Sequence, residues 1–334
     1  MKNLVFVFAS LMLLSVIFSC KEEGKIKIGF LEPQLKTDRY IKETEYFTKK
    51  IEALGGECIS ASADEDDQLQ IRQAKEMISK GVKVLVICAV NQNTAPEIVR
   101  VAHKAKIKVI AYDRMIRNCD LDYYITFDSE KVGELMANYV TKIKSEGNYI
   151  LLGGDKADLN ASLVKAGQLK VISPLINAGK IKIIYNTFIE SWSGDNAKGE
   201  IKKFLDLSQE KPDVILASND GMANGVIDLL KEYKLQGKIL ITGQDALLPS
   251  CRNIVNGYQT MTVYKSVKTL ANQAAEISIK ICRKEIVSDF NTTVSNGKKE
   301  VPALLLEPIV VDKNNIKAVV VGDGFLSEKD IYQN

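Results

Sequence analysis

Apolar, β-branched runs alternate with amphipathic stretches along the chain from residue 25 onward. Runs of this kind predict strands, and in the first part of the chain they cover residues 26–30, 57–60, 82–87, 109–112 and 123–127. The stretches between them carry apolar side chains at helical spacing and predict helices over 40–54, 67–80 and 96–106. Such alternation is typical of βαβ units and a parallel sheet.

A second series of the same kind follows. Strands are predicted over 149–152, 181–188, 214–217 and 238–242, and helices over 130–144, 160–178, 196–207 and 222–234. A further helix is predicted over 265–284, where Val267, Leu270 and Ala274 recur at helical spacing. Two comparable series predict an α/β protein with two doubly wound parallel-sheet lobes and a cleft between them.

Composition is consistent with two globular lobes. The chain has 334 residues, too many for one small core, and 46% of them are apolar and 26% charged. The formal net charge of +3 is too small to indicate a nucleic-acid partner or an anionic membrane surface. We therefore expect no nucleic acid among the partners.

The first twenty residues have the pattern of a targeting segment. A short basic start precedes an apolar run over 4–18, and Ser19 and Cys20 end it. The run is too short to span a membrane comfortably. It resembles a bacterial lipoprotein signal, in which Cys20 becomes the lipidated first residue; cleavage as an ordinary signal peptide near Ser19 is the alternative. We expect export to the cell envelope, with the membrane contacted through the lipid anchor only.

The remaining cysteines and the single histidine argue against metal or nucleophile chemistry. Five cysteines remain after Cys20, an odd number without CxxC spacing, and they are Cys58, Cys88, Cys119, Cys251 and Cys282. His103 stands alone in a helical pattern that predicts a surface position. The sequence therefore predicts no metal site, no cofactor and no catalytic triad.

Polar side chains follow four of the predicted strands at the point where each strand ends. They are Asp113 with Arg114, Asp158 with Asn160, Asn219, and Asp245. In open α/β sheets a ligand lies outside the carboxyl ends of the strands. Carboxylates and amides there, without a phosphate-binding glycine motif, indicate a small neutral polyol. Each residue could instead cap a turn or helix, and Asp220 is predicted to cap the helix that starts after it.

Several longer segments resemble a known family, and they lie at 109–116, 127–135, 217–220, 243–246, 259–265 and 312–316. The chain resembles type I periplasmic binding proteins, in particular the xylose-binding members that serve bacterial ABC importers. The resemblance implies a clamshell of two lobes with a three-crossing hinge. By that analogy one lobe comprises 25–127 plus 265–286, and the other 128–264 plus 287–334.

The resemblance also implies which residues contact the sugar. They are Arg39, Tyr40, Asp113, Arg114, Asp158, Asn160, Trp192, Asn219, Asp245 and Lys265. Tyr40 stands where the family has tryptophan, so ring preference could differ. Trp192 could alternatively be a core residue, although its polar loop favours a binding role. The expected ligand is a pyranose monosaccharide, D-xylose first, with glucose or another pentose as weaker candidates.

Three classes of function follow. The first is a monomeric transport receptor that delivers sugar to an ABC permease, and the second is a receptor of the same fold that signals to a membrane sensor kinase. An enzyme is the weakest of the three, because carboxylates matched to Arg and Lys stay ionised and make poor general acids. The sequence leaves transport and sensing open.

Overall fold

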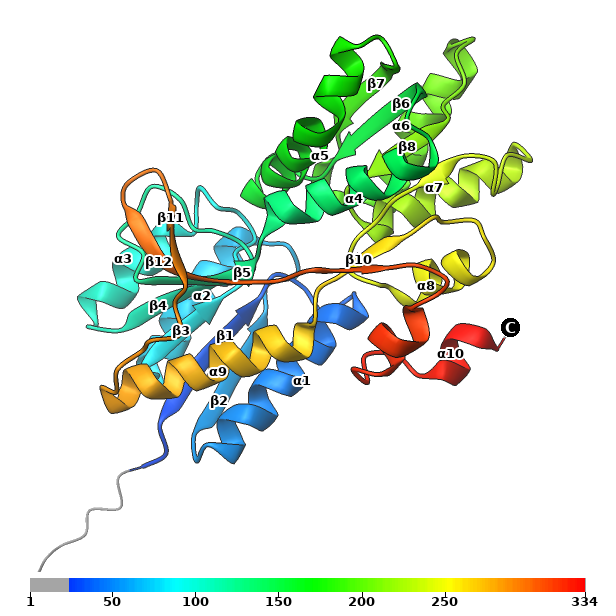
Figure 1. The fold of residues 1–334 in the computed structure, drawn as a ribbon. Coiled ribbons are helices and arrows are strands. Elements are labelled where there is room, and N and C mark those ends of the chain that lie inside the picture. Colours follow the sequence, from blue (N-terminus) through cyan, green and yellow to red (C-terminus); the bar gives the residue numbers. More distant parts are fainter. Residues whose placement is uncertain (1–23, 334) are drawn as a thin grey trace, which may run out of the picture.

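The structure is a computed structural model that describes residues 24–333, so the signal over 1–20 and Cys20 lie outside the described residues. Figure 1 shows two α/β lobes, one built around each of two sheets. The larger sheet has seven strands in the order β11-β12-β5-β4-β3-β1-β2. Its strands are β1 (Lys27–Glu32), β2 (Glu57–Ser62), β3 (Val84–Ile87), β4 (Lys108–Tyr112), β5 (Tyr123–Phe127), β11 (Thr292–Ser295) and β12 (Glu300–Leu306).

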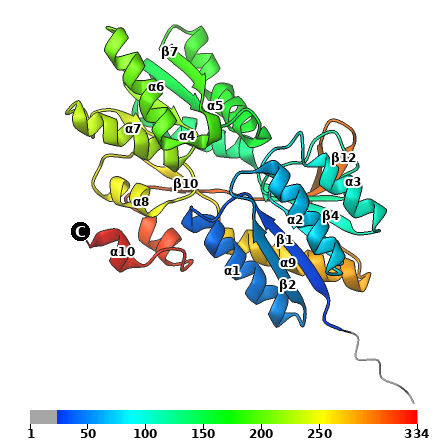
Figure 2. The ribbon, with the colours of Figure 1, turned by 180° about the vertical axis from the view of Figure 1, so that it is seen from behind.

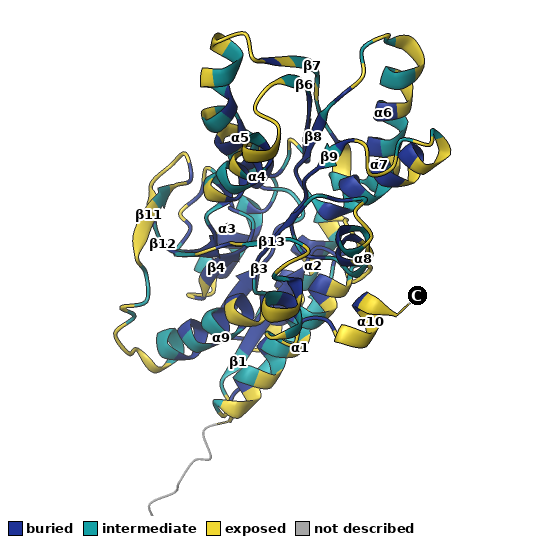
Figure 3. Ribbon diagram, turned by 45° about the vertical axis from the view of Figure 1, so that its right-hand side comes forward, coloured by how far each residue is buried: buried dark blue, intermediate teal, exposed yellow. Residues whose placement is uncertain are grey.

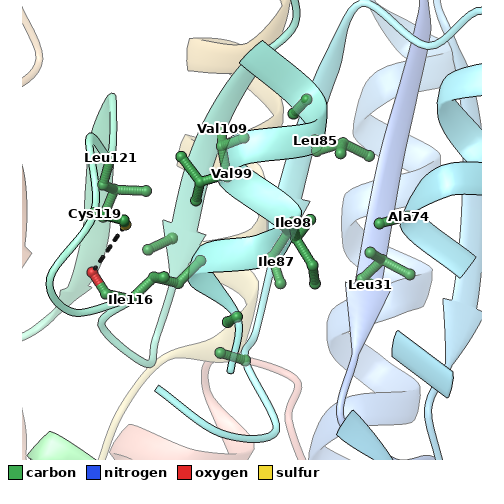
Figure 4. Packing of buried hydrophobic residues seen from close by; sticks show 14 of the residues in the cluster. Leu31, Ala74, Leu85, Ile87, Ile98, Val99, Val109, Ile116, Cys119 and Leu121 are labelled. Atoms are coloured by element: carbon green, nitrogen blue, oxygen red, sulfur yellow. Dashed lines mark hydrogen bonds between the residues drawn. The ribbon is translucent and has the colours of Figure 1, made fainter. Parts of the chain in front are cut away.

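Helices cover both faces of this sheet, so successive strand residues belong to two different cores. On one face, Leu85 and Ile87 pack with α2 (Asp67–Ser79) and α3 (Pro96–Lys104), as the close-up in Figure 4 shows. On the other, Val84 and Val86 pack against α1 (Asp38–Ala53) and α9 (Val267–Arg283). Burial on both faces explains why the central strands β1, β3, β4 and β5 are rich in apolar residues without polar alternation (Figure 3).

The second lobe is built on the four-stranded sheet β7-β6-β8-β9. Its strands are β6 (Gly147–Gly153), β7 (Ile181–Phe188), β8 (Val214–Ala217) and β9 (Leu240–Ile241). Four helices cover it, namely α4 (Ser129–Ile143), α5 (Leu159–Asn177), α6 (Gly194–Leu207) and α7 (Asp220–Glu232). Helices α4 and α5 touch through Gly133 and Gly167, where an added Cβ would lie 1.9 Å from the partner helix's backbone oxygen.

The C-terminal part completes this lobe. Strand β10 (Thr262–Tyr264) pairs antiparallel with β13 (Ile309–Val311). Helix α8 (Leu248–Val255), the π-helical turn Lys317–Val321 and α10 (Glu328–Tyr332) share one apolar cluster with Tyr264 and Phe325. None of α8, α10, β10, β11, β12 or β13 was predicted as a separate element, because their apolar runs are short or irregular.

The chain passes between the lobes at three places, seen from both sides in Figures 1 and 2. They lie between β5 and α4, between β10 and α9, and between β12 and β13. Our assignment of residues from 287 onward to the second lobe is wrong for 287–306, since Phe290 already stacks on Tyr123 of β5. Strand β12 pairs in parallel with β5, and its Val301 and Ala303 are buried in the first lobe. The third crossing therefore follows Leu306.

Within residues 24–333, no helix combines the length and apolar character needed to cross a membrane. The five cysteines of this part are free thiols. His103 is partly buried rather than fully at the surface, because its Nε2 lies 2.8 Å from Oδ2 of Asp122, and its side chain is 30% exposed.

Candidate functional site

One cavity between the two lobes is lined by all ten residues expected to contact a sugar. It has a volume of about 160 Å³. Each lobe and one hinge crossing contribute residues, namely Arg39 and Tyr40 at the start of α1, Asp113 and Arg114 after β4, Asp158 and Asn160 at the start of α5, Trp192 in the short helix Glu190–Trp192, Asn219 before α7, Asp245 after β9, and Lys265 after β10. The cavity is also lined by residues that we did not predict, including Gln34, Glu65, Ser191 and Gln244.

Arg39 is the centre of the site's charge network. Its Nε donates to Oε1 of Glu43 at 2.9 Å, one helical turn further along α1. Its Nη2 lies 3.0 Å from Oδ2 of Asp113, and its Nη1 lies 3.2 Å from Oδ1 of Asp245. The side chain is only 6% exposed. Because Asp245 belongs to the second lobe, this one guanidinium joins the two lobes.

Lys265 lies where the chain crosses between lobes and reaches the same two aspartates. Its Nζ is 3.1 Å from Oδ1 of Asp245 and 3.9 Å from Oδ1 of Asp113. Burial by itself would raise the pKa of the Asp113 carboxyl, but Arg39, Lys265 and Arg114 lower it to about 2. Asp113 therefore stays ionised and can only accept hydrogen bonds.

A second set of contacts crosses the cleft through Arg114 and Asn160. Arg114 Nε lies 3.4 Å from Oδ2 of Asp158, and its Nη2 donates to the Tyr40 hydroxyl at 3.2 Å. Asn160 Nδ2 donates to the backbone oxygen of Asp113 at 2.9 Å. Asp158 also caps α5, and burial, partly offset by Arg114, raises the pKa of its carboxyl. The lobes are thus in contact through hydrogen bonds as well as through charge.

Two aromatic side chains, one from each lobe, line the cavity with these charges. Tyr40 is 7% exposed and belongs to the first lobe. Trp192 lies directly over Gly154 in the second lobe, where an added Cβ would come within 2.3 Å of the indole ring. The indole Nε1 is buried and has no hydrogen-bond partner among the described residues, so it is an available donor. Aromatic faces of this kind can cover the C–H face of a small ring.

Asp220 does not cap α7 as we predicted. Asn219 does so, since its Oδ1 accepts from the backbone N–H of Met222 at 2.9 Å. Asp220 is fully buried one residue later and accepts three hydrogen bonds, from Leu247 N–H at 2.9 Å, Thr262 Oγ1 at 3.0 Å and Gln259 Nε2 at 2.8 Å.

These three hydrogen bonds hold a strained loop. Asp245 and Ala246 have φ values of 96° and 51°, in the region that only glycine adopts readily. Because Asp220 ties Leu247 to the strand after the loop, it fixes where the Asp245 carboxylate lies. Sequence reasoning missed this role because the side-chain partners lie 39 and 42 residues away along the chain.

Glu43 is a second functional residue that sequence reasoning missed. It is fully buried, and burial raises the pKa of its carboxyl to about 7 although Arg39 opposes the shift. A signal for it was present, since Glu43 stands four residues after Arg39 in a predicted helix, a spacing that brings side chains together.

The donors and acceptors of the cavity match a neutral polyol. Carboxylates accept from hydroxyl groups, Arg and Lys donate to them, and Asn219 can do both. Hydrogen bonds to charged groups are worth about 1.5–3 kcal/mol each, against about 1 kcal/mol for neutral pairs. Among residues 24–333, no group of three His, Cys, Asp or Glu side chains is placed to hold a metal ion.

A two-lobed α/β clamshell with a polar cavity between its lobes defines the class of solute-binding proteins. The model of the periplasmic binding protein domain family matches residues 28–286, and the chain belongs to that family. It is 43% identical to the D-xylose-binding periplasmic protein of Haemophilus influenzae over 96% of each chain, and 42% identical to that of Escherichia coli over 99% of each.

Solved structures agree with this assignment. An ABC transporter solute-binding protein from Clostridium phytofermentans, determined with bound β-D-glucose, superposes with a TM-score of 0.84 at 28% identity, covering 91% of this chain and 99% of that one. The expected type I clamshell fold is confirmed.

The buried Asp220 carboxyl predicts a loss of stability as the pH rises from about 4 to about 8. Burial raises its pKa to about 8, so its contribution to stability is complete below about pH 4, where the unfolded chain is also protonated, and is lost progressively up to about pH 8. We expect Asp220→Asn to cost about 1–2 kcal/mol near pH 4, through weaker hydrogen bonds, and the deficit to shrink as the pH rises toward 8. Thermal unfolding followed by circular dichroism across pH checks this. Asp228→Asn, on the exposed side of α7, is the matched control, and a deficit independent of pH would contradict the prediction.

Proposed function

We propose that this protein binds a pyranose monosaccharide, D-xylose first, in the cavity between its lobes and delivers it to an ABC permease. The observation that carries the proposal is the convergence on one cavity of all ten residues expected to contact a sugar. The D-xylose-binding names of relatives that match nearly the full chain support the choice of sugar. The ABC transporter relative with bound glucose supports the delivery role and keeps glucose as a weaker candidate, alongside another pentose.

Each group of residues has a distinct part in the proposed binding. Asp113 and Asp245 accept hydrogen bonds from sugar hydroxyls, while Arg39, Arg114 and Lys265 donate to them. Asp158, Asn160 and Asn219 supply the remaining polar contacts, and Tyr40 and Trp192 cover the ring faces. A site built around hydroxyls rejects ligands that lack them, because its buried polar groups would be left unpaired.

Tyr40 distinguishes this site from those of the family members with tryptophan at that position. Its smaller ring leaves more room in the cavity, and its hydroxyl accepts a hydrogen bond from Arg114. An additional hydroxymethyl group could use that room, which is the reason glucose remains the second sugar.

Binding across the cleft implies closure of the two lobes around the sugar. With the position of β12 taken into account, the first lobe comprises 25–127 plus 265–306, and the second lobe comprises 128–264 plus 307–333. A sugar favours the closed state only by binding it more tightly than the open one, and contacts divided between lobes provide that difference. A monomer suffices, because both halves of the cavity come from one chain.

Signalling to a membrane sensor kinase is the second candidate role. It requires the same sugar site and differs only on the outer surfaces of the lobes. The relatives' periplasmic names and the transporter relative favour delivery to a permease.

Substitution of the two central aspartates tests the site. Asp113→Ala and Asp245→Ala should each weaken D-xylose binding by about 2–4 kcal/mol, because each removes charged hydrogen bonds from a closed cavity. In a thermal-shift panel of pentoses and hexoses, D-xylose at a hundred times its Kd should stabilise the wild type by about 2.7 kcal/mol. Asp120→Ala changes an exposed aspartate of the first lobe and should leave the shift unchanged. Absence of a shift with every sugar, or a full shift in both site variants, would refute the proposal.

Anchoring is tested at Cys20. We infer that this cysteine is lipidated after export and that the lipid alone holds the protein at the membrane. Cys20→Ser should move the protein from the membrane fraction to the soluble fraction and abolish incorporation of labelled palmitate, while sugar binding by the purified protein is retained. Equal incorporation of label by the wild type and the variant would show that Cys20 is not the anchor.

A further inference from the structure

Two glutamates lie behind the sugar cavity without lining it. Glu32 ends β1 and is 1% exposed, and Glu43 on α1 is 0% exposed. Glu43 Oε1 accepts from Arg39, but its Oε2 and both carboxylate oxygens of Glu32 have no hydrogen-bond partner among the described residues. The Tyr112 hydroxyl is likewise buried and unpartnered there. A buried carboxylate without partners is costly when ionised, whereas a protonated one is neutral and can donate a hydrogen bond.

The charge balance around the cavity also favours a protonated glutamate. Three cations serve the site, namely Arg39, Arg114 and Lys265. Five carboxylates surround them, with side chains that are at most 13% exposed, and they are Glu32, Glu43, Asp113, Asp158 and Asp245. Asp113 and Asp245 each have two cationic partners, while no ion pair involves Glu32 in the described part of the chain. The excess negative charge therefore falls on the glutamates.

We propose that Glu32 and Glu43 together hold a proton behind Arg39, and that closure over a sugar takes up proton at this pair. The inference rests on the sugar-binding function proposed above. It adds a second ligand, the proton, whose site is distinct from the cavity that holds the sugar.

Uptake of a proton on closure follows from the number of carboxylates that pair with Arg39. In the closed arrangement Arg39 pairs with Asp245 of the second lobe as well as with Glu43 and Asp113 of its own. When the lobes separate, Asp245 leaves, and Arg39 stabilises the ionised glutamate more strongly. Closure therefore brings the Asp245 carboxylate to Arg39 and removes water from the cleft. Both changes favour the protonated form of the glutamate pair.

Charged and titratable groups face the pair from several elements. They are Arg39 on α1, Cys88 after β3, Tyr112, Asp113 and Arg114 at the end of β4, and Lys265 after β10. Burial raises the pKa of Cys88 and Tyr112 further above neutral, and the neighbouring cations keep Asp113 ionised, so these three groups do not compete for the proton near neutral pH. Burial also raises the pKa of both glutamates, that of Glu43 to about 7, which supports the assignment.

Calorimetry of the purified full chain with D-xylose tests the inference. Titrations in phosphate and in Tris at the same pH give the number of protons taken up, because the two buffers differ in ionisation enthalpy. We expect an uptake of about 0.3 to 1 proton per sugar near neutral pH, and an affinity that falls about threefold or more between about pH 6.5 and about pH 8.5.

Two isosteric variants assign the proton. Glu32→Gln removes no observed hydrogen bond, and Glu43→Gln keeps an oxygen that can accept from Arg39. Each should still bind D-xylose, with the uptake and the pH dependence of affinity reduced or lost. Asp120→Asn is the control, because Asp120 is an exposed carboxyl of the first lobe that does not line the cavity, and the uptake should persist in that variant.

The outcomes separate the two proposals. If the wild type binds sugar with the same observed binding enthalpy in both buffers, after subtraction of the heats of dilution, no proton is taken up and the proton site is overturned. This outcome does not depend on whether the variants fold, and it leaves the sugar function intact. Retention of the full uptake in both Glu32→Gln and Glu43→Gln overturns the proton site as well. Failure of D-xylose and every other monosaccharide to bind would overturn the sugar function and the proton site together.

Discussion

The site depends on one buried guanidinium that must be neutralised by carboxylates from both lobes. Arg39 stands at the beginning of α1 and contacts Glu43, Asp113 and Asp245, each within 3.2 Å. A buried cation without partners would cost several kcal/mol, so the positions of all three carboxylates are constrained by it. Glu43 is supplied by the same helix, Asp113 by the end of a central strand, and Asp245 by a strained loop that Asp220 holds in place.

The same constraint links ligand binding to the arrangement of the lobes. Contacts across the cleft join Arg39 to Asp245, Arg114 to Asp158, and Asn160 to the backbone of Asp113. Ion pairs of this kind gain little net stability, because the charges lose water when they pair. A sugar that fills the cavity satisfies the remaining lone pairs and protons of the same groups. A ligand that binds the closed arrangement more tightly than the open one therefore shifts the equilibrium toward closure.

The sequence predicts local features of this fold well and long-range ones poorly. Strands buried on both faces give apolar runs, so β5 and β8 match their predicted bounds. The edge strand β7 matches as well, although it is only partly buried. Polar residues at strand ends gather at one edge of a parallel sheet, which is why their positions along the chain were enough to indicate a site. The contributions of Arg39, Tyr40 and Lys265 came from family resemblance, because nothing in their local pattern distinguishes them from surface or core residues. For Trp192 the polar loop around it was an additional local sign.

What could not be predicted depends on partners distant in sequence. Pairing of β12 with β5 is decided by packing in the first lobe, and residues 287–306 carry no local sign of it. Asp220 resembles a helix cap until its contacts with Gln259 and Thr262 are known. Glu32 resembles an ordinary polar residue at the end of a strand. Only its burial and its position beside Glu43 show that the pKa of its carboxyl is raised.

The central claim is that charged groups of both lobes, organised around Arg39, bind one sugar ring between them. A crystal structure of the protein grown with D-xylose tests it most directly. The account predicts a single pyranose in the cavity, with hydroxyl groups within hydrogen-bond distance of carboxylates from both lobes, including Asp113 and Asp245, and with Tyr40 and Trp192 against the ring. A sugar bound outside this cavity, or held by residues of one lobe only, would contradict it.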